Sequence, residues 1–479
     1  MKQTWSPPIL ESTLEQLKDW NADLAARGGR CVSSSKRELT KTMGLNFFLH
    51  NRMIEGTLMP AMQAMFEMQT DVAESWLQTL SGKKELPAHV EEMNARMLSG
   101  LKYGWLITHL GRKLFGSATF PGETRLAENE LMTLTYIPPH AGVPPLDTAL
   151  FHVGGFLPFS DRIFRALPEA NLFDHFLARG IGVYAMELRR DGLSPAKVGA
   201  CTLSQLIDMI DELSTVAFLH SGRRKMMLEG YCGLALPMLC YLAARPRDAD
   251  AKFDVAFTMV APVDGRECKL LHESIATTPH YLIWASTIMT EVMGGYVPGT
   301  SLQTNMDIPL RSLFFKSHLG RFAMGWKQQQ YAKISRIDQL DAAQRKELAG
   351  AYWISPEHAR CSPMPGNVTR FTTRLWIKGI DERLALPYRY KGRPLNLRTI
   401  LDETEIQLAG FYGGKDRVVP ESTAHILRDT MGQRYTHVVH PRAGHISYVL
   451  SPEVWSPEHK YALDPNPIDL VLELRKGRP

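Results

Sequence analysis

The sequence KMMLEGYCGL, residues 225–234, decides the fold. A short apolar segment leads directly into Gly230, Cys232 follows two residues later, and an apolar helical run begins at Leu234. A nucleophilic side chain on such a sharp strand-to-helix turn is typical of a nucleophile elbow. The turn would place the Cys232 sulfur at the carboxyl end of a strand, where open α/β sheets place their ligands. The N-terminus of the following helix favours the thiolate, which is the reactive form of cysteine.

Strands and helices alternate on both sides of this turn. The pattern predicts strands at 131–137, 148–153, 180–188, 225–229, 253–260, 405–412 and 435–439, and helices at 171–178, 203–218 and 234–244. Strands that alternate with helices of this length predict a mostly parallel, doubly wound α/β sheet.

The length of 479 residues exceeds one simple domain, because domains average about 150 residues. Residues 1–125 are expected to form a helical N-terminal lobe, 126–264 and 401–479 the two parts of the α/β core, and 265–400 an inserted lid. In the lobe, Met59, Met62, Met65 and Met68 recur at helical spacing. Such a stripe most often packs in the core. The alternative is an exposed hydrophobic surface that binds a polymer granule, an acyl chain or a partner helix.

Two later turns supply partners for the cysteine. Asp416 follows the strand predicted at 405–412, and His445 follows the last strand in Gly-His-Ile. The order nucleophile, acid, histidine is that of the α/β-hydrolases. His445 is therefore expected to act as general base, with Asp416 holding its tautomer. The carboxylates of Asp191, Asp254 and Asp264 are alternative acids.

An oxyanion hole can also be placed on the sequence. One donor is expected to be the backbone N–H of Gly233, next to the nucleophile. The second is expected from the glycine-rich loop after the strand at 148–153, through the N–H of Val153 or Gly154. His152, beside this loop, is interpreted as a structural histidine.

Composition narrows the class of protein. The net charge of +5 is spread along the chain without a run of five like charges, which argues against nucleic-acid binding. The six cysteines form no Cys-x-x-Cys pair, so no cysteine metal motif is predicted and a reducing, cytoplasmic location is expected. No apolar segment is long enough to cross a bilayer, and no cofactor or metal is expected. Cys31, Cys201, Cys240, Cys268 and Cys361 are interpreted as incidental thiols.

Several segments together resemble the polyhydroxyalkanoate synthase family, over about residues 119–455. The resemblance lies in the segments ENELMTL at 128–134, NLFDHFLARG at 171–180, GYC at 230–232, GRPLNL at 392–397, DRVVP at 416–420 and GHI at 444–446. The family pattern has glycine where this chain has Leu234.

The resemblance implies an α/β-hydrolase fold and a Cys232–His445–Asp416 acyltransferase. An acyl-CoA thioester would acylate Cys232, and a hydroxyl, in the family that of a 3-hydroxyacyl unit or growing polyester, would accept the acyl group. It also implies a homodimer and association with polyester granules. Two alternatives stay open: a thioesterase or transferase making a single bond, and a non-catalytic homologue that binds granules or a partner.

Overall fold

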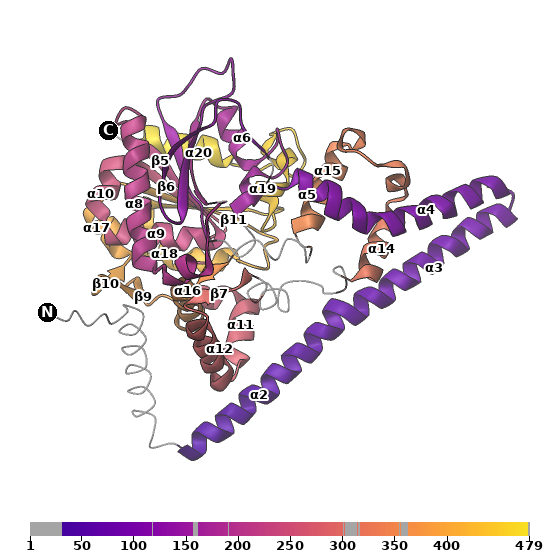
Figure 1. Cartoon of the computed structure of the whole chain (residues 1–479), viewed down its shortest axis with the longest axis horizontal. Coiled ribbons are helices and arrows are strands. Elements are labelled where there is room, and N and C mark those ends of the chain that lie inside the picture. Colours follow the sequence, from indigo (N-terminus) through magenta and orange to yellow (C-terminus); the bar gives the residue numbers. More distant parts are fainter. Residues whose placement is uncertain are drawn as a thin grey trace.

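An eight-stranded sheet forms the centre of the globular body in the computed structural model (Figure 1). The structure describes residues 31–116, 118–156, 161–189, 191–299, 301, 314, 317–353, 355 and 363–477. The strand order is β1-β2-β4-β3-β5-β6-β11-β12. The pairs β1–β2 and β2–β4 are antiparallel, and all later pairs are parallel. This is the topology of the α/β-hydrolase fold, so the predicted fold class is confirmed.

The central strands are the most deeply buried part of the sheet. Every residue of β3, β5 and β6 is buried, as expected for parallel strands covered on both faces. The sheet strands are β1 Thr124–Glu128, β2 Met132–Ile137, β3 Ala149–Val153, β4 Gly182–Leu188, β5 Met226–Tyr231, β6 Phe253–Met259, β11 Gln407–Gly413 and β12 Tyr435–His440.

Helices cover both faces of this sheet. Gly230 of β5 faces α9, where Met238 lies. On the opposite face, His152 of β3 contacts Phe173 of α6. The helices packed around the sheet are α6 Leu172–Leu177, α7 Pro195–Ala200, α8 Leu203–His220, α9 Ala235–Ala244, α10 Pro246–Lys252, α17 Arg398–Glu403, α18 His425–Met431, α19 Ser447–Leu450 and α20 Pro467–Lys476.

The region between β6 and β11 holds further helices and two small sheets. The helices are α11 Lys269–Thr277, α12 His280–Val292, α14 His318–Lys327, α15 Ala342–Trp353 and α16 Gly366–Lys378. The small sheets pair β7 Tyr296–Val297 with β8 Met364–Pro365, and β9 Ala385–Tyr390 with β10 Arg393–Asn396. The hairpin β9–β10 is absent from the sequence prediction because Pro387 and Pro394 interrupt any strand pattern there. The role of this region as a lid stays a prediction.

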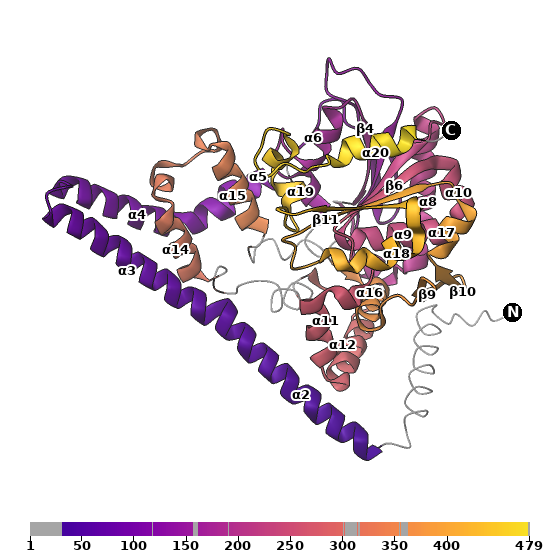
Figure 2. The same cartoon turned by 180° about the vertical axis from the view of Figure 1, so that it is seen from behind.

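A helical arm, residues 31–106, projects from the globular body (Figures 1 and 2). It consists of α2 Cys31–Met53, a π-helical turn at Ile54–Leu58, α3 Met59–Leu80 and the returning α4 Leu86–Leu106; a π-helical turn at Ile107–Gly111 and α5 Arg112–Leu114 continue towards the sheet. The π-helical turn lies just before Pro60, whose ring and missing N–H interrupt regular helical hydrogen bonding. The helix predicted at residues 10–26 lies outside the described residues.

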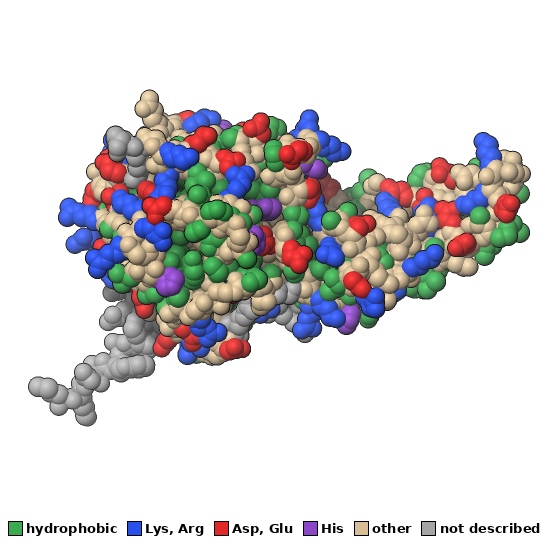
Figure 3. Space-filling view, turned by 90° about the horizontal axis from the view of Figure 1, so that it is seen from above, with side chains coloured by type: hydrophobic (Ala, Val, Ile, Leu, Met, Phe, Trp, Pro, Cys, Tyr) green, Lys and Arg blue, Asp and Glu red, His purple; other side chains and the backbone are tan. Residues whose placement is uncertain are grey.

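The methionine stripe lies on the surface of this arm. Met59, Met62 and Met65 are 58%, 60% and 50% exposed, and only Met68 packs against a small cluster around Ala64. The core interpretation is therefore wrong for three of the four methionines. Figure 3 shows the arm extending from the body with hydrophobic side chains on its surface. Within the described part of the chain, no helix combines the length and apolar character that a bilayer span needs.

Two contacts fix the arm to the region between β6 and β11, one through α4 and one through α3. A Cβ at Gly325 of α14 would lie 2.5 Å from the Tyr103 Cβ, so glycine permits this close packing. The indole N–H of Trp326 donates to the Asp71 carboxylate across 2.9 Å. The N-terminal helices therefore pack against residues far away in the sequence.

Candidate active site

Cys232 lies at the strand-to-helix turn that the sequence predicts. It follows β5 directly and begins a single turn of 3-10 helix, Cys232–Leu234, that leads into α9. Its φ angle is +49°, which is costly for a residue that carries a side chain. A Cβ at Gly230 would lie 2.7 Å from the Ala235 Cα, so the turn needs glycine there. Backbone strain concentrated at a cysteine on a strand end is the geometry of a nucleophile elbow.

His445 and Asp416 form a hydrogen-bonded pair. The His445 Nδ1 lies 2.8 Å from the Asp416 Oδ2. The other carboxylate oxygen, Oδ1, accepts the backbone N–H groups of Val418 and Val419 across 2.8 and 2.9 Å. The Asp416 carboxylate is completely buried, and the His445 side chain is 14% exposed. The acid is therefore fixed on both oxygens, and it orients the imidazole through one nitrogen.

The remaining face of the His445 ring meets the thiol. Burial lowers the pKa of His445, but attraction to the Asp416 carboxylate and the Cys232 sulfur, with hydrogen bonds to both, raises it to about 10. The ring therefore keeps its proton at neutral pH, and a protonated imidazole beside the sulfur stabilises the thiolate. The fold brings together the three side chains expected to be catalytic.

Tyr231 is a further contact in this site that the sequence does not indicate. Its hydroxyl donates to the backbone carbonyl of His445. Its ring packs edge-on against the His445 ring, with 6.0 Å between centroids, and against Phe164. Because Tyr231 immediately precedes Cys232, this hydrogen bond joins the nucleophile turn to the histidine loop.

The alternative acids are engaged elsewhere or exposed. Asp264 forms an ion pair with Arg266, with 2.7 Å between Oδ2 and Nη2, and its side chain also accepts the Arg266 backbone N–H. Asp254 lies 2.6 Å from the Arg475 Nε. Asp191 is exposed. Among the described residues, Asp416 is the carboxylate that contacts His445.

The other described thiols differ from Cys232 in burial. Cys201, Cys240 and Cys268 are buried, whereas Cys232 is partly exposed. Burial raises the pKa of Cys201 to about 12 and that of Cys240 further. Burial also raises the pKa of Cys268 well above its ordinary value, and the nearby Cys232 sulfur and Asp416 carboxylate add to this effect. These three thiols are protonated at neutral pH. Cys361 and the Cys31 side chain lie outside the described residues.

The segments expected to form the oxyanion hole follow neighbouring strands. Val153, the last residue of β3, pairs with Gly230 of β5, and Gly233 lies in the turn that follows β5. A Cβ at Gly154 would lie only 2.1 Å from the Met186 carbonyl oxygen, so the loop after β3 passes close to β4. Residues 157–160 of this loop lie outside the described residues. The N–H groups of Gly233, Val153 and Gly154 stay the predicted donors.

A buried ionisable pair lies directly beneath these loops. His152 of β3 pairs in register with Glu229 of β5, and the Nδ1 of His152 contacts the Glu229 carboxylate. Both side chains are fully buried. The buried position of His152 agrees with its interpretation as a structural histidine, but the sequence pattern does not predict Glu229 as its partner. The available signal is a glutamate within an otherwise apolar buried strand, since buried carboxylates need partners.

A separate open groove of about 420 Å³ lies on the arm. It is lined by Met65, Met68, Gln69, Val72, Ala73 and Trp326, and no member of the Cys232–His445–Asp416 triad contributes to it. This groove is not a candidate reactive site, because its lining carries no nucleophile or titratable group.

Comparisons with known proteins do not identify a family for this chain. No family model and no curated protein matches the chain. Among solved structures, a soluble variant of monoglyceride lipase from Saccharomyces cerevisiae is 10% identical, with a TM-score of 0.42, over 75% of this chain and 95% of that one. A monoacylglycerol lipase from Paleococcus ferrophilus is 14% identical, with a TM-score of 0.39, over 72% and 98%. A bromoperoxidase from Bacillus anthracis is 9% identical, with a TM-score of 0.38, over 74% and 99%. Likeness this low says nothing about substrate, so the chemistry must be argued from the residues of the site.

Proposed function

We propose that this chain is a cysteine-dependent acyltransferase that passes an acyl group from an acyl-CoA thioester through Cys232 to a hydroxyl. The observation that carries the proposal is the strained Cys232 beside His445, whose ring is held by the buried Asp416 carboxylate. A nucleophile, a base and an orienting acid are the three groups that covalent acyl transfer needs. The motifs shared with polyhydroxyalkanoate synthases support a 3-hydroxyacyl substrate and a polyester product, a dimer and attachment to polyester granules.

Acylation begins with attack of the Cys232 sulfur on the thioester carbonyl. The sulfur proton resides on His445, and the carbonyl oxygen becomes an oxyanion that the Gly233 N–H and a Val153 or Gly154 N–H would stabilise. Collapse breaks the bond between the carbonyl carbon and the CoA sulfur. CoA leaves as a thiol after taking the proton from His445, and the acyl group stays on Cys232 as a thioester.

Transfer repeats these steps with an alcohol. His445 removes the hydroxyl proton as the oxygen attacks the acyl carbon, and the bond from carbon to the Cys232 sulfur breaks. The product is an ester, and the proton returns to the Cys232–His445 pair. Exclusion of water from the site favours the ester over the free acid.

The test is intact mass spectrometry of the full chain after exposure to a panel of acyl-CoA thioesters that includes 3-hydroxybutyryl-CoA. The wild type should gain one acyl mass and release CoA. Cys232→Ala should lose the acyl adduct and reduce CoA release by about 10⁴-fold or more. Cys201→Ala, which removes a buried protonated thiol, is the matched control and should retain both signals. Equal CoA release by wild type and Cys232→Ala, or no reaction with any thioester, would refute the proposal.

Product analysis separates the chemical outcomes after acylation. Growing turbidity and a high-mass polyester support the polymerase assignment. A small soluble ester limits the enzyme to single transfers, and a free acid identifies a thioesterase. If the wild type is inert and Cys232 is alkylated only slowly, the result favours the alternative of a non-catalytic binding homologue.

A further inference from the structure

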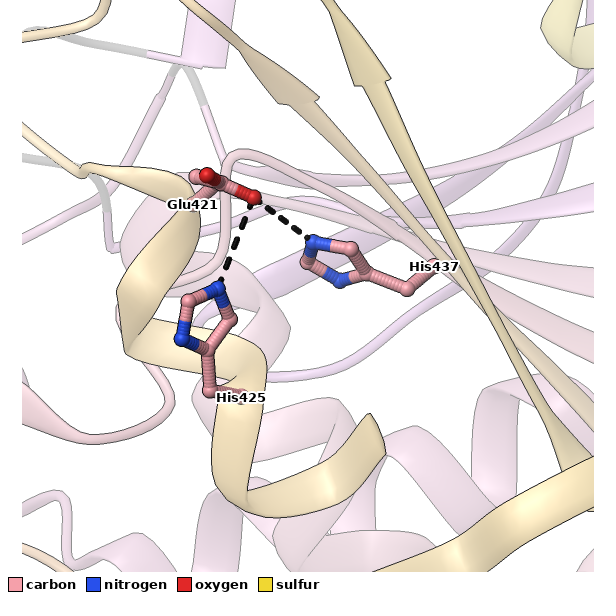
Figure 4. Close-up of side chains that lie close together, drawn as sticks. All are labelled: Glu421, His425 and His437. Carbon is pink, nitrogen blue, oxygen red and sulfur yellow. Dashed lines mark hydrogen bonds and ion pairs between the residues drawn. The ribbon is translucent and has the colours of Figure 1, made fainter. Parts of the chain in front are cut away.

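A cluster of one carboxylate and two imidazoles lies between the loop after β11, helix α18 and strand β12. Glu421 begins the short 3-10 helix Glu421–Ala424, His425 begins α18, and His437 lies in β12. Figure 4 shows both rings pointing at the Glu421 carboxylate. The cluster is distinct from the Cys232 site, and none of its members contacts the triad.

The distances within the cluster match those of a metal ligand set. The His437 Nε2 lies 3.1 Å and the His425 Nε2 3.5 Å from the Glu421 Oε2. All three ligand atoms lie within 4.8 Å of one another. In a tetrahedral zinc site with bonds of about 2.0–2.1 Å, neighbouring ligand atoms are about 3.3–3.4 Å apart. A zinc-sized ion therefore fits with small side-chain adjustments.

The placement of the two imidazole rings also favours a bound cation. The His425 Nε2 is buried and faces the Glu421 Oε2 across 3.5 Å, which is longer than an ordinary hydrogen bond. His437 stacks on Tyr412, with 5.3 Å between ring centroids. The stacked ring holds the His437 Nε2 at 3.1 Å from the Glu421 Oε2.

The surrounding charges do not neutralise the cluster. Arg428 and Asp429 on α18 pair with each other across 2.8 Å. The Glu421 carboxylate is 42% exposed, which leaves room for water as a further ligand. Two imidazoles, one carboxylate and a water form a ligand set that zinc and related divalent ions take in proteins.

We propose that Glu421, His425 and His437 bind one divalent transition-metal ion of the zinc class, with water completing the coordination. Glu421 continues the loop that carries Asp416, and His437 lies on the strand that leads to His445. The ion would fasten these two segments to each other beside the triad. The inference stands independently of the acyltransferase proposal, because it uses none of the triad side chains.

The test measures metal binding by the full chain after treatment with EDTA and removal of the chelator. Titration with ZnCl₂, followed by calorimetry and elemental analysis, should give one ion per chain in wild type. His437→Ala and Glu421→Gln should each raise the dissociation constant of that ion by about tenfold or more. His459→Ala, which changes a partly exposed histidine outside the cluster, is the matched control and should bind as wild type. Circular dichroism and size-exclusion chromatography of each variant verify that it is folded.

The absorption spectrum of bound Co²⁺ distinguishes the proposed site from metal binding at Cys232 and His445. At the proposed site Co²⁺ should give the visible bands of a tetrahedral nitrogen and oxygen set without a thiolate charge-transfer band, and Cys232→Ala should leave these bands unchanged. A thiolate band lost in Cys232→Ala, equal binding by the His437→Ala variant, or no stoichiometric binding by wild type would each overturn the proposal.

Discussion

Two carboxylate–histidine pairs lie on the same two structural units, the loop after β11 and the strand β12 with its following loop, yet they differ in character. Asp416 is completely buried and fixed by two backbone N–H groups, and its histidine also meets a thiol, so the pKa of His445 rises to about 10. Glu421 is 42% exposed, and burial lowers the pKa of its partner His437. The same side-chain types therefore differ in the direction of the histidine pKa shift, according to burial and the third group that they face.

Removal of the charge on the buried acid should have the largest effect on the rate of acyl transfer. Asp416→Asn keeps the shape of the side chain but loses the charge that holds the His445 tautomer and stabilises its protonated form. The rate of acyl transfer should fall by about 10⁴-fold, the loss known for the equivalent change in serine protease triads. Steady-state CoA release at saturating thioester measures it. A loss below tenfold would show that Asp416 does not orient the base.

A third histidine, His175, shows the effect of burial on an imidazole pKa without a carboxylate partner. His175 stacks on Trp455, with 4.6 Å between centroids, and burial, aided by the positive charge of Arg179, lowers its pKa to about 4. The unfolded chain therefore binds a proton between about pH 6.5 and 4 that the folded chain does not. The free energy of unfolding should decrease as pH falls through this window, by up to about 1.4 kcal/mol per pH unit from this residue.

Urea denaturation between pH 7 and 4.5 measures this contribution. His175→Gln should reduce the slope of stability against pH relative to wild type, because glutamine has no proton to gain. Identical slopes in the two proteins would mean that the His175 ring does not stay neutral in the folded state.

The contact between Tyr231 and His445 should have a smaller effect. Tyr231→Phe removes the hydroxyl that donates to the His445 carbonyl and leaves that acceptor without its donor. We expect a loss of about 1–2 kcal/mol in stability and a lower rate of acyl transfer, with little change in KM. Denaturation and steady-state kinetics on the same preparation separate the two effects. A raised KM with an unchanged rate would instead place Tyr231 in substrate binding.

The exposed pair should matter least without metal. Glu421→Gln in the chelator-treated protein should change stability by less than about 1 kcal/mol and leave acyl transfer within about twofold of wild type, because the Glu421 side chain is 42% exposed and interactions of exposed carboxylates contribute little. The same assays as for Asp416→Asn apply. A large loss in metal-free protein would mean that the two pairs are coupled.

The sequence predicts the elements whose signals are local. The elbow is visible because an apolar strand, Gly230, Cys232 and a helix follow one another directly, and Asp416 and His445 each follow a strand in a recognisable turn. These local patterns also predict the mostly parallel sheet, because the strands alternate with helices along the chain.

Cross-strand partners are not visible in the same way. The pairing of His152 with Glu229, and the meeting of His437 with Glu421, depend on strand register and on how α18 packs, neither of which is encoded in a short segment. The methionine stripe shows the converse limit. Its helical spacing predicts one shared face, but whether that face is covered depends on distant parts of the chain, and Met59, Met62 and Met65 are exposed.

The two glycines around Cys232 carry unequal constraints. A side chain at Gly230 would strike the Ala235 backbone, whereas a Cβ at Gly233 would meet no atom within 4 Å. The small residues that the elbow needs are therefore at 230 and 235, while position 234 accommodates a buried leucine. Search patterns that demand glycine two residues after the nucleophile will pass over chains built in this way, and substitutions at 233 offer a tolerant position for reshaping the entrance to the sulfur.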